Sequence, residues 1–205
     1  MIRKIVLASN NAGKLKELKY LLSEFNVEII AQDELNVPDA EETGLTFIEN
    51  AILKARNACL YTGLPSIADD SGLEVDALNG RPGIYSARYA GENKTSENYC
   101  NRLLQVLKGI PKDIRTARFQ SVVVFMRHAE DPSPLIAQGT WAGEILTETK
   151  GHGGFGYDPV FYIQSLGATV AELSPEIKNQ HSHRARAMKA LLLQLKTEKQ
   201  NDQCL

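Results

Sequence analysis

Residues 2–25 read IRKIVLASNNAGKLKELKYLLSEF, and this stretch decides the class of fold. Residues 2–8 predict a buried strand, and residues 14–25 predict a helix because leucines and a phenylalanine recur at helical spacing. Similar patterns recur further along the chain. They predict strands at 27–31 and 118–127, two short strands within 135–145 broken by Gly139 and Gly143, and helices at 46–61, 96–107 and 182–196. Alternation in the first half and a strand-rich second half predict an α/β fold.

The join between the first strand and helix, residues 9–14, is a candidate anion site. Free amides at a helix start, the helix dipole and the charge of Lys14 all favour a phosphate there. It is not a P-loop, because Ala8 and Leu15 stand where that pattern needs glycine and serine or threonine. The alternative is a capped helix with a surface lysine.

Composition limits the class of protein. The 205 residues carry a formal net charge of −2, which argues against a nucleic-acid binder or a protein of anionic membranes. Three widely spaced cysteines without a CxxC pair indicate neither a disulfide framework nor a zinc site. The apolar run at the amino terminus is too short for a signal peptide, and we expect no membrane span. We therefore expect a cytoplasmic protein of one domain, 1–205, with a frayed polar tail at 197–205.

Residues 68–76, ADDSGLEVD, are the most informative motif for function. Two adjacent carboxylates at a strand end, followed by a Ser-Gly turn, are suited to hold a hard divalent cation or to activate water. Asp69 and Asp70 point to opposite faces of extended backbone, so one can face a cleft while the other turns inward. An acidic turn without catalysis is the alternative.

Three further segments carry candidate groups. Glu41 and Glu42 precede a capping box formed by Thr46 and Glu49. The alternatives to a functional role are that Glu49 only caps the helix and that Lys54 only lies on its solvent-exposed face. Residues 151–159, GHGGFGYDP, offer close backbone approach and a ring for a flat ligand, or else form a tight loop. Lys178 and residues 181–186, HSHRAR, gather donors for carbonyl or phosphate oxygens, whereas a metal at His181 and His183 is disfavoured.

Taken together, these segments resemble the noncanonical purine nucleoside triphosphate pyrophosphatases, the inosine/xanthosine triphosphatase family. The resemblance runs over nearly the full length and rests on residues 9–14, 49–51, 68–72, 82–88, 154–159 and 182–184. It points to the bacterial branch and implies a magnesium-dependent homodimer that hydrolyses ITP, dITP and XTP to the monophosphate and pyrophosphate. The implied fold is elongated and two-lobed around a mixed, twisted central sheet, with a substrate cleft between the lobes.

The resemblance also implies the site residues. Asp70 activates the water and helps to hold Mg2+, Glu41 is the second metal ligand, and Glu42 is the fallback. Phe155 stacks on the base, and His183 and Arg184 donate to a 6-keto oxygen, which leaves the exclusion of GTP unexplained. The implied substrate-binding residues are Ser9, Asn10, Asn11, Ala12, Gly13, Lys14, Ser71, Phe155, Gly156, Tyr157, Asp158, Lys178, His183 and Arg184. Many relatives have Thr-Gly where this chain has Ser9 and Asn10, and asparagine tolerates left-handed dihedrals at small strain.

Two other functions compete with this one. A pyrophosphatase for modified pyrimidine nucleotides is the nearest rival among enzymes. A nucleotide-binding sensor without hydrolysis is the rival outside enzymes, and loss of the acidic residues would be its mark. Asp69, Asp70 and Glu41 are all present, which favours the enzyme.

Overall fold

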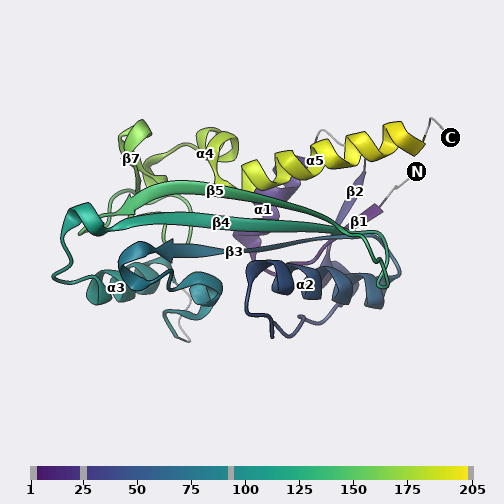
Figure 1. Ribbon diagram of the computed structural model, residues 1–205, viewed down its shortest axis with the longest axis horizontal. Helices are drawn as coiled ribbons and strands as arrows, with labels where there is room; N and C mark the ends of the chain where they lie inside the picture. Colours follow the sequence, from purple (N-terminus) through teal and green to yellow (C-terminus); the bar gives the residue numbers. More distant parts are fainter. Residues whose placement is uncertain (1–3, 24–26, 92–94, 203–205) are drawn as a thin grey trace. The chain divides into compact units, whose positions relative to one another are not determined.

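The computed structural model describes residues 4–23, 27–91 and 95–202 (Figure 1). The chain divides into two compact units. The first unit comprises Met1–Asp70, Ser121–Gly139 and Arg184–Leu205, and the second comprises Ser71–Gln120 and Thr140–His183. Among the described residues, no helix is both long enough and apolar enough to cross a membrane.

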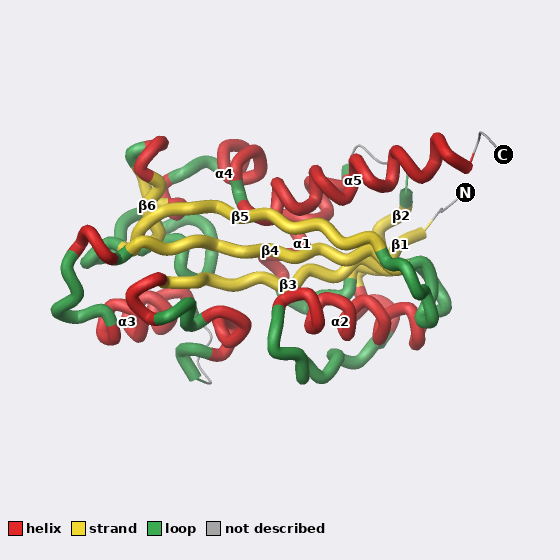
Figure 2. Tube along the Cα trace, in the orientation of Figure 1, coloured by secondary structure: helices red, strands yellow, loops and turns green. Residues whose placement is uncertain are grey.

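The strands form a seven-stranded mixed sheet in the order β2-β1-β3-β4-β5-β6-β7 (Figure 2). β1 is parallel to β2 and β3, whereas β6 is antiparallel to β5 and β7. The bounds are Lys4–Leu7 for β1, Glu28–Ala31 for β2, Ser66–Val75 for β3, Thr116–Met126 for β4, Leu135–Ile145 for β5, Phe161–Ile163 for β6 and Ala168–Thr169 for β7. The predicted α/β class with a mixed sheet is confirmed, and the elongated outline with a cleft stays a prediction.

In the first unit, alternation along the strands supplies two apolar faces. The first-unit helices are α1 (Ala12–Leu22), α2 (Phe47–Thr62) and α5 (His183–Asp202), whose residues from Arg184 onward belong to this unit. Leu7, Ile67 and Phe125 pack with leucines of α1 and with Met188 and Leu191 of α5. The opposite face carries Val6, Ala68 and Val124, which pack against Ala51, Ala55 and Ala58 of α2. Figure 1 accordingly shows α5 and α2 on opposite sides of β4.

The second unit has its own core. It contains α3 (Ser96–Val106), α4 (Pro175–His181) and a 3-10 helix, Gly83–Arg88. Tyr99 and Leu103 of α3 pack in one cluster with Leu73 of β3, Trp141 of β5 and Phe161 of β6. Buried apolar side chains therefore hold α1, α2 and α5 against the sheet in the first unit and α3 in the second.

The structure corrects two predictions about strands. Asp69–Gly72 do not form a turn at a strand end, because β3 runs unbroken from Ser66 to Val75. Likewise, β5 is one strand of 11 residues rather than two short ones. Gly143 has a packing role there: a Cβ at this position would lie 2.5 Å from the carbonyl oxygen of Tyr162 and 2.8 Å from the Phe161 ring.

The remaining differences concern element ends and short elements. α1 begins at Ala12, before the predicted Lys14, and α5 extends past the predicted end at Lys196 to Asp202. α4, β6 and β7 are too short for their periodicity to stand out in the sequence. The predicted helix end at Phe25 and the predicted strand start at Ile2 lie outside the described residues.

We predict that Gly143→Ala destabilises the protein by about 1–3 kcal/mol, because the added methyl overlaps β6 backbone and the Phe161 ring. Urea unfolding followed by circular dichroism measures the change. Ala142→Ser, at the exposed neighbouring position, is the control and is expected to stay within about 0.5 kcal/mol of wild type. An unchanged urea midpoint for Gly143→Ala would show that β5 and β6 accommodate the added methyl group without loss of stability, and it would contradict the prediction.

Candidate active site

The loop before α1 is built as a helix start with its amides near the surface. Asn11 is the N-cap residue, and its side-chain oxygen accepts a hydrogen bond from the Lys14 amide at 3.1 Å. The hydroxyl of Ser9 accepts from the Asn11 amide at 3.2 Å, and Asn10 donates to Asp39 at 2.8 Å. Asn10, Asn11 and Ala12 are exposed, and Gly13 is half-buried. This is the arrangement that a helix N-terminus needs to meet an anion.

Lys14 is not the surface lysine of the alternative interpretation. Its side chain is 16% exposed, and its Nζ lies 2.8 Å from Oδ2 of Asp69. The helix is therefore capped by Asn11 and Lys14 is also buried, with its ammonium paired to Asp69 of β3.

Asp69 is the centre of a buried charge network in the first unit. Ser121 donates to its Oδ1 at 2.6 Å, and Nε of Arg184 donates to its Oδ2 at 3.4 Å. Arg184, itself 2% exposed, also forms an ion pair with Glu17 of α1. Burial alone would raise the pKa of the Asp69 carboxyl, but the charges of Arg184 and Lys14 hold it well below its usual range. The Asp69 carboxylate is therefore ionised, and both of its oxygens contact neighbouring side chains.

Asp70, the next residue of β3, takes different partners, as alternation along extended backbone requires. Its Oδ1 accepts from Nζ of Lys54 at 2.6 Å, and the same Nζ lies 3.1 Å from Oε1 of Glu42. Oδ2 of Asp70 is buried without a hydrogen-bond partner. Burial raises the pKa of the Asp70 carboxyl against the opposing charges of Lys54 and Lys14. A desolvated carboxylate with one uncommitted oxygen is suited to accept a proton or bind a cation.

The acidic loop 41–44 is fastened to the first two turns of α2. Oδ1 of Asn50 accepts from the Gly44 amide at 2.9 Å. A Cβ on Gly44 would lie 2.5 Å from Cβ of Glu49, so the loop approaches the helix more closely than a larger residue permits. Glu42 reaches Lys54, whereas Glu41 is exposed. The structure thus places the fallback glutamate, rather than the first choice, beside the Lys54–Asp70 pair.

The sequence left open that Glu49 only caps α2 and that Lys54 only lies on its exposed face. The structure agrees with the first of these and contradicts the second. Glu49 does close the capping box, because its carboxylate accepts from the Thr46 amide at 2.8 Å while Thr46 accepts from the Glu49 amide. Lys54 does not solvate a helix face, since its side chain is 14% exposed and paired with two carboxylates. Among the described residues, no three histidine, cysteine or acidic side chains gather closely enough to hold a metal alone.

In the second unit, the loop Phe155–Asp158 is held by its own carboxylate. Oδ2 of Asp158 accepts from the Phe155 amide at 2.9 Å and from Nζ of Lys178 at 2.6 Å. That ammonium lies 4.4 Å from the centre of the Phe155 ring, a cation–π contact. Gly154 has φ +72°, and a Cβ there would overlap the Asp158 carboxylate. The glycines therefore serve a compact loop that presents an aromatic ring beside a buried lysine.

Two residues expected to line a base pocket also contact other parts of the second unit. The ring of Tyr157 is 4% exposed, its hydroxyl donates to the Ser86 carbonyl at 3.0 Å, and burial raises its pKa. Its side chain therefore anchors the loop. The Gly156 carbonyl lies 3.6 Å from Sγ of Cys100 on α3. Ser71 is half-buried on β3, directly after Asp70.

His183 is the first residue of α5, and its imidazole stacks on Phe119 of β4. The ring centres are 4.8 Å apart and the planes differ by 15°. His183 is 6% exposed, so the interpretation of its neighbour His181 as a surface histidine does not extend to it.

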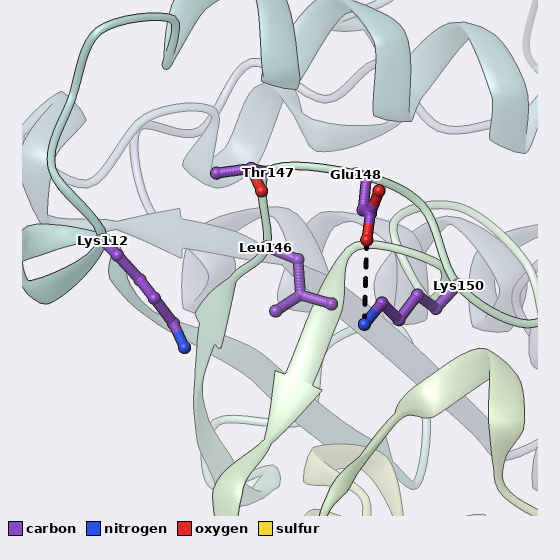
Figure 3. Close-up of a pocket in the computed structure, with 5 residues that line it drawn as sticks. All are labelled: Lys112, Leu146, Thr147, Glu148 and Lys150. Carbon is purple, nitrogen blue, oxygen red and sulfur yellow. Dashed lines mark ion pairs between the residues drawn. The ribbon is translucent and has the colours of Figure 1, made fainter.

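A separate pocket in the second unit contains none of the predicted site residues (Figure 3). It is lined by Lys112, Leu146, Thr147, Glu148 and Lys150, and Lys150 pairs loosely with Glu148 at 3.8 Å. Its volume of about 180 Å³ is below the roughly 300 Å³ of an ordinary ligand pocket. It is not the candidate active site.

Several functional residues were missed by sequence reasoning, and some left a signal. Glu17 follows Lys14 by three residues and so shares its face of α1. Ser121 is a small polar residue at the start of the apolar run Val122–Met126, where a buried hydroxyl needs a partner. The stack of Phe119 on His183 left no signal, because it joins residues far apart in the chain.

The mixed sheet, the exposed helix start with a buried lysine and the acidic pair beside Lys54 are features of an α/β protein suited to phosphorylated ligands. The sequence model of the Ham1 family matches residues 5–194, and the chain therefore belongs to the Ham1 family.

Relatives and solved structures agree with this assignment. The dITP/XTP pyrophosphatase of Shigella flexneri is 59% identical over 93% of this chain and 97% of its own length. The dITP/XTP pyrophosphatase of Escherichia coli strain K12 is 57% identical with the same coverage. A HAM1 protein from Coxiella burnetii superposes with a TM-score of 0.88 at 48% identity, over 96% of this chain and 100% of its own. The Staphylococcus aureus Ham1 protein gives 0.84 at 45% identity, with the same coverage.

We predict that Asp69→Asn destabilises the first unit by about 3–5 kcal/mol, because Lys14 and Arg184 then share no buried negative charge. Guanidinium unfolding measures the change. Glu28→Gln, which breaks an exposed pair with Lys4, is the control and is expected to have little effect because solvent screens that pair. A loss below about 1 kcal/mol for Asp69→Asn would contradict the view of Asp69 as the anchor of the network.

Proposed function

We propose that this chain hydrolyses noncanonical purine nucleoside triphosphates, namely dITP, XTP and ITP, to the monophosphate and pyrophosphate. This reaction removes them from the nucleotide pool before they enter DNA or RNA. The observation that carries the proposal is the Asp70 carboxylate, which pairs through one oxygen with Lys54 and keeps its other oxygen buried without a hydrogen bond. The high identity to relatives named dITP/XTP pyrophosphatases over nearly their whole length supports the substrate class.

In this proposal, the first unit binds the triphosphate. The amides at the start of α1 and the side chains of Ser9, Asn10 and Asn11 meet phosphate oxygens, and Lys14 supplies the positive charge. Because Asp69 already fixes Lys14 at 2.8 Å, little ordering of that side chain remains to be done when the substrate binds. Ser71, directly after Asp70, is assigned a substrate contact.

Asp70 is the proposed general base. It takes a proton from the water that attacks the α-phosphoryl group, and pyrophosphate leaves. Lys54 holds the carboxylate in place and offsets its charge when the negatively charged triphosphate approaches. A raised pKa makes the carboxyl a better proton acceptor than an exposed aspartate.

The residues present fit a magnesium ion. Mg2+ takes oxygen ligands and is commonly held by one or two carboxylates together with substrate phosphates and water. Oδ2 of Asp70 is the first proposed ligand, and Glu42 is proposed as the second in preference to Glu41, because Glu42 shares Lys54 with Asp70. When bound, the metal would neutralise the leaving pyrophosphate.

In this proposal, the purine base of the substrate binds to the loop 155–158 and to the segment around α4. Phe155 stacks on the purine, one face of its ring being covered by Lys178. His183 and Arg184 donate to the 6-keto oxygen, and adenine is disfavoured because its 6-amino group leaves those donors unpaired. Because Arg184 is already bound to Asp69 and Glu17, His183 is the main proposed donor to the 6-keto oxygen. A homodimer, which the family resemblance implies, and a cytoplasmic location, which the composition favours, remain predictions.

The test is the release of pyrophosphate and monophosphate from ITP, dITP, XTP, GTP and ATP, with and without Mg2+, at mildly alkaline pH. The proposal predicts rapid, magnesium-dependent turnover of the first three, with GTP and ATP nearly inert. A parallel panel of methylated pyrimidine nucleotides tests the rival enzyme. Tight binding of dITP without turnover would instead identify a sensor.

We predict that Asp70→Asn lowers kcat for dITP by about 100-fold or more, while the dissociation constant of dITP changes little, because the amide cannot accept the proton. Stopped-time assays and calorimetric titration measure the two quantities. Asp76→Asn, which changes a carboxylate paired with Arg118 beyond the end of β3, is the matched control and should retain full turnover. Near-normal kcat in Asp70→Asn would refute the assignment of the base.

A further inference from the structure

A chain of aromatic rings in the second unit ends on His183. Trp141 of β5 lies 6.4 Å from Phe161 of β6, and Phe161 lies 4.4 Å from Phe119 of β4, both in tilted arrangements. Phe119 in turn stacks on the imidazole of His183. The change from tilted to nearly parallel at the last step means that a flat face of Phe119 is presented to the imidazole.

Phe119 has little freedom to move. It is 8% exposed, and the fully buried Phe161 ring packs against it. Offset stacking of two rings at this separation is favourable beyond the area that it buries. Phe119 therefore acts as a fixed plane against which His183 must lie.

This plane restricts the imidazole. The torsion that turns an imidazole about its Cβ–Cγ bond is broad, with roughly two-fold symmetry, so an unrestrained ring samples many planes. With an interplanar angle of 15°, the ring is confined to the plane parallel to Phe119. Both ring nitrogens lie in that plane, and hydrogen bonds weaken steeply when the donor points away from its acceptor.

We propose that Phe119 is a specificity-determining positioning residue, which holds the His183 imidazole in the plane where its N–H meets a purine 6-keto oxygen. Phe119 touches no substrate in this proposal. The inference rests on the proposed function, because it concerns the orientation of His183, which that function assigns to recognition of the purine base. It adds to that function a residue inside the core that sets the preference for a 6-keto over a 6-amino purine.

The test compares kcat/KM for ITP and ATP in wild type, Phe119→Met and Phe119→Tyr. Methionine keeps an apolar side chain but removes the flat face, and tyrosine keeps the face. We expect Phe119→Met to lower the ITP-to-ATP ratio about tenfold, the size of one hydrogen bond, and Phe119→Tyr to retain the wild-type ratio. Phe125→Met, the same substitution on the same strand in the first unit's core, controls for loss of a buried ring and should keep the ratio.

A double-mutant cycle separates positioning from packing. If Phe119 acts through His183, Phe119→Met should not lower the ratio further in a His183→Ala background. Proton chemical shifts of the His183 ring provide a readout independent of activity. The Phe119 ring current shifts these protons upfield in wild type and Phe119→Tyr, and the shift should disappear in Phe119→Met.

Three results would overturn the proposal. These are an unchanged ITP-to-ATP ratio in Phe119→Met, an equal further loss in the His183→Ala background, and His183 proton shifts that do not respond to removal of the Phe119 ring. A wild-type protein that does not prefer ITP over ATP would instead overturn the proposed function, and the proton shifts would still decide whether Phe119 orients His183.

Discussion

The buried carboxylate of Asp69 is the interaction on which the first unit depends. A charge at 1% exposure is costly unless it is paired, and here the amino terminus of α1, the start of α5 and β4 each supply a partner. Removing any partner leaves a buried charge with fewer contacts. The network therefore joins α1, α5 and β4 to β3 through one buried group, and it holds Lys14 beside the loop before α1.

Asp70 gains its properties from being the next residue of the same strand. Alternation sends its side chain to different partners, so the anchoring carboxylate of Asp69 and the proposed base Asp70 are adjacent in sequence yet separate in environment. Lys54 and Glu42 complete a second group around Asp70, and the contact of Gly44 with Asn50 fastens the acidic loop. Pairs of carboxylates whose surroundings differ in this way commonly divide structural and chemical roles.

Local sequence signals predicted the α/β class, the capping box at Thr46 and a helix after the first strand, although its start was placed at Lys14 rather than Ala12. Each of these features depends on neighbouring residues. The local signals failed where distant residues decide. Ser71 and Gly72 favour a turn locally, yet pairing within the sheet keeps them in β3, and Gly143 accommodates β6 rather than breaking β5. The burial of Lys54, the role of Ser121 and the stack of Phe119 on His183 arise only when remote segments meet. The family resemblance supplied the roles of the site residues that periodicity alone left open.

The most direct test of the account is hydrolysis of dITP in ¹⁸O-labelled water, followed by mass spectrometry of both products. Water activated by Asp70 and directed at the α-phosphoryl group places the label in the monophosphate, with unlabelled pyrophosphate. Label in the pyrophosphate would show attack on the β-phosphoryl group, and it would contradict the proposed positions of the base and the triphosphate.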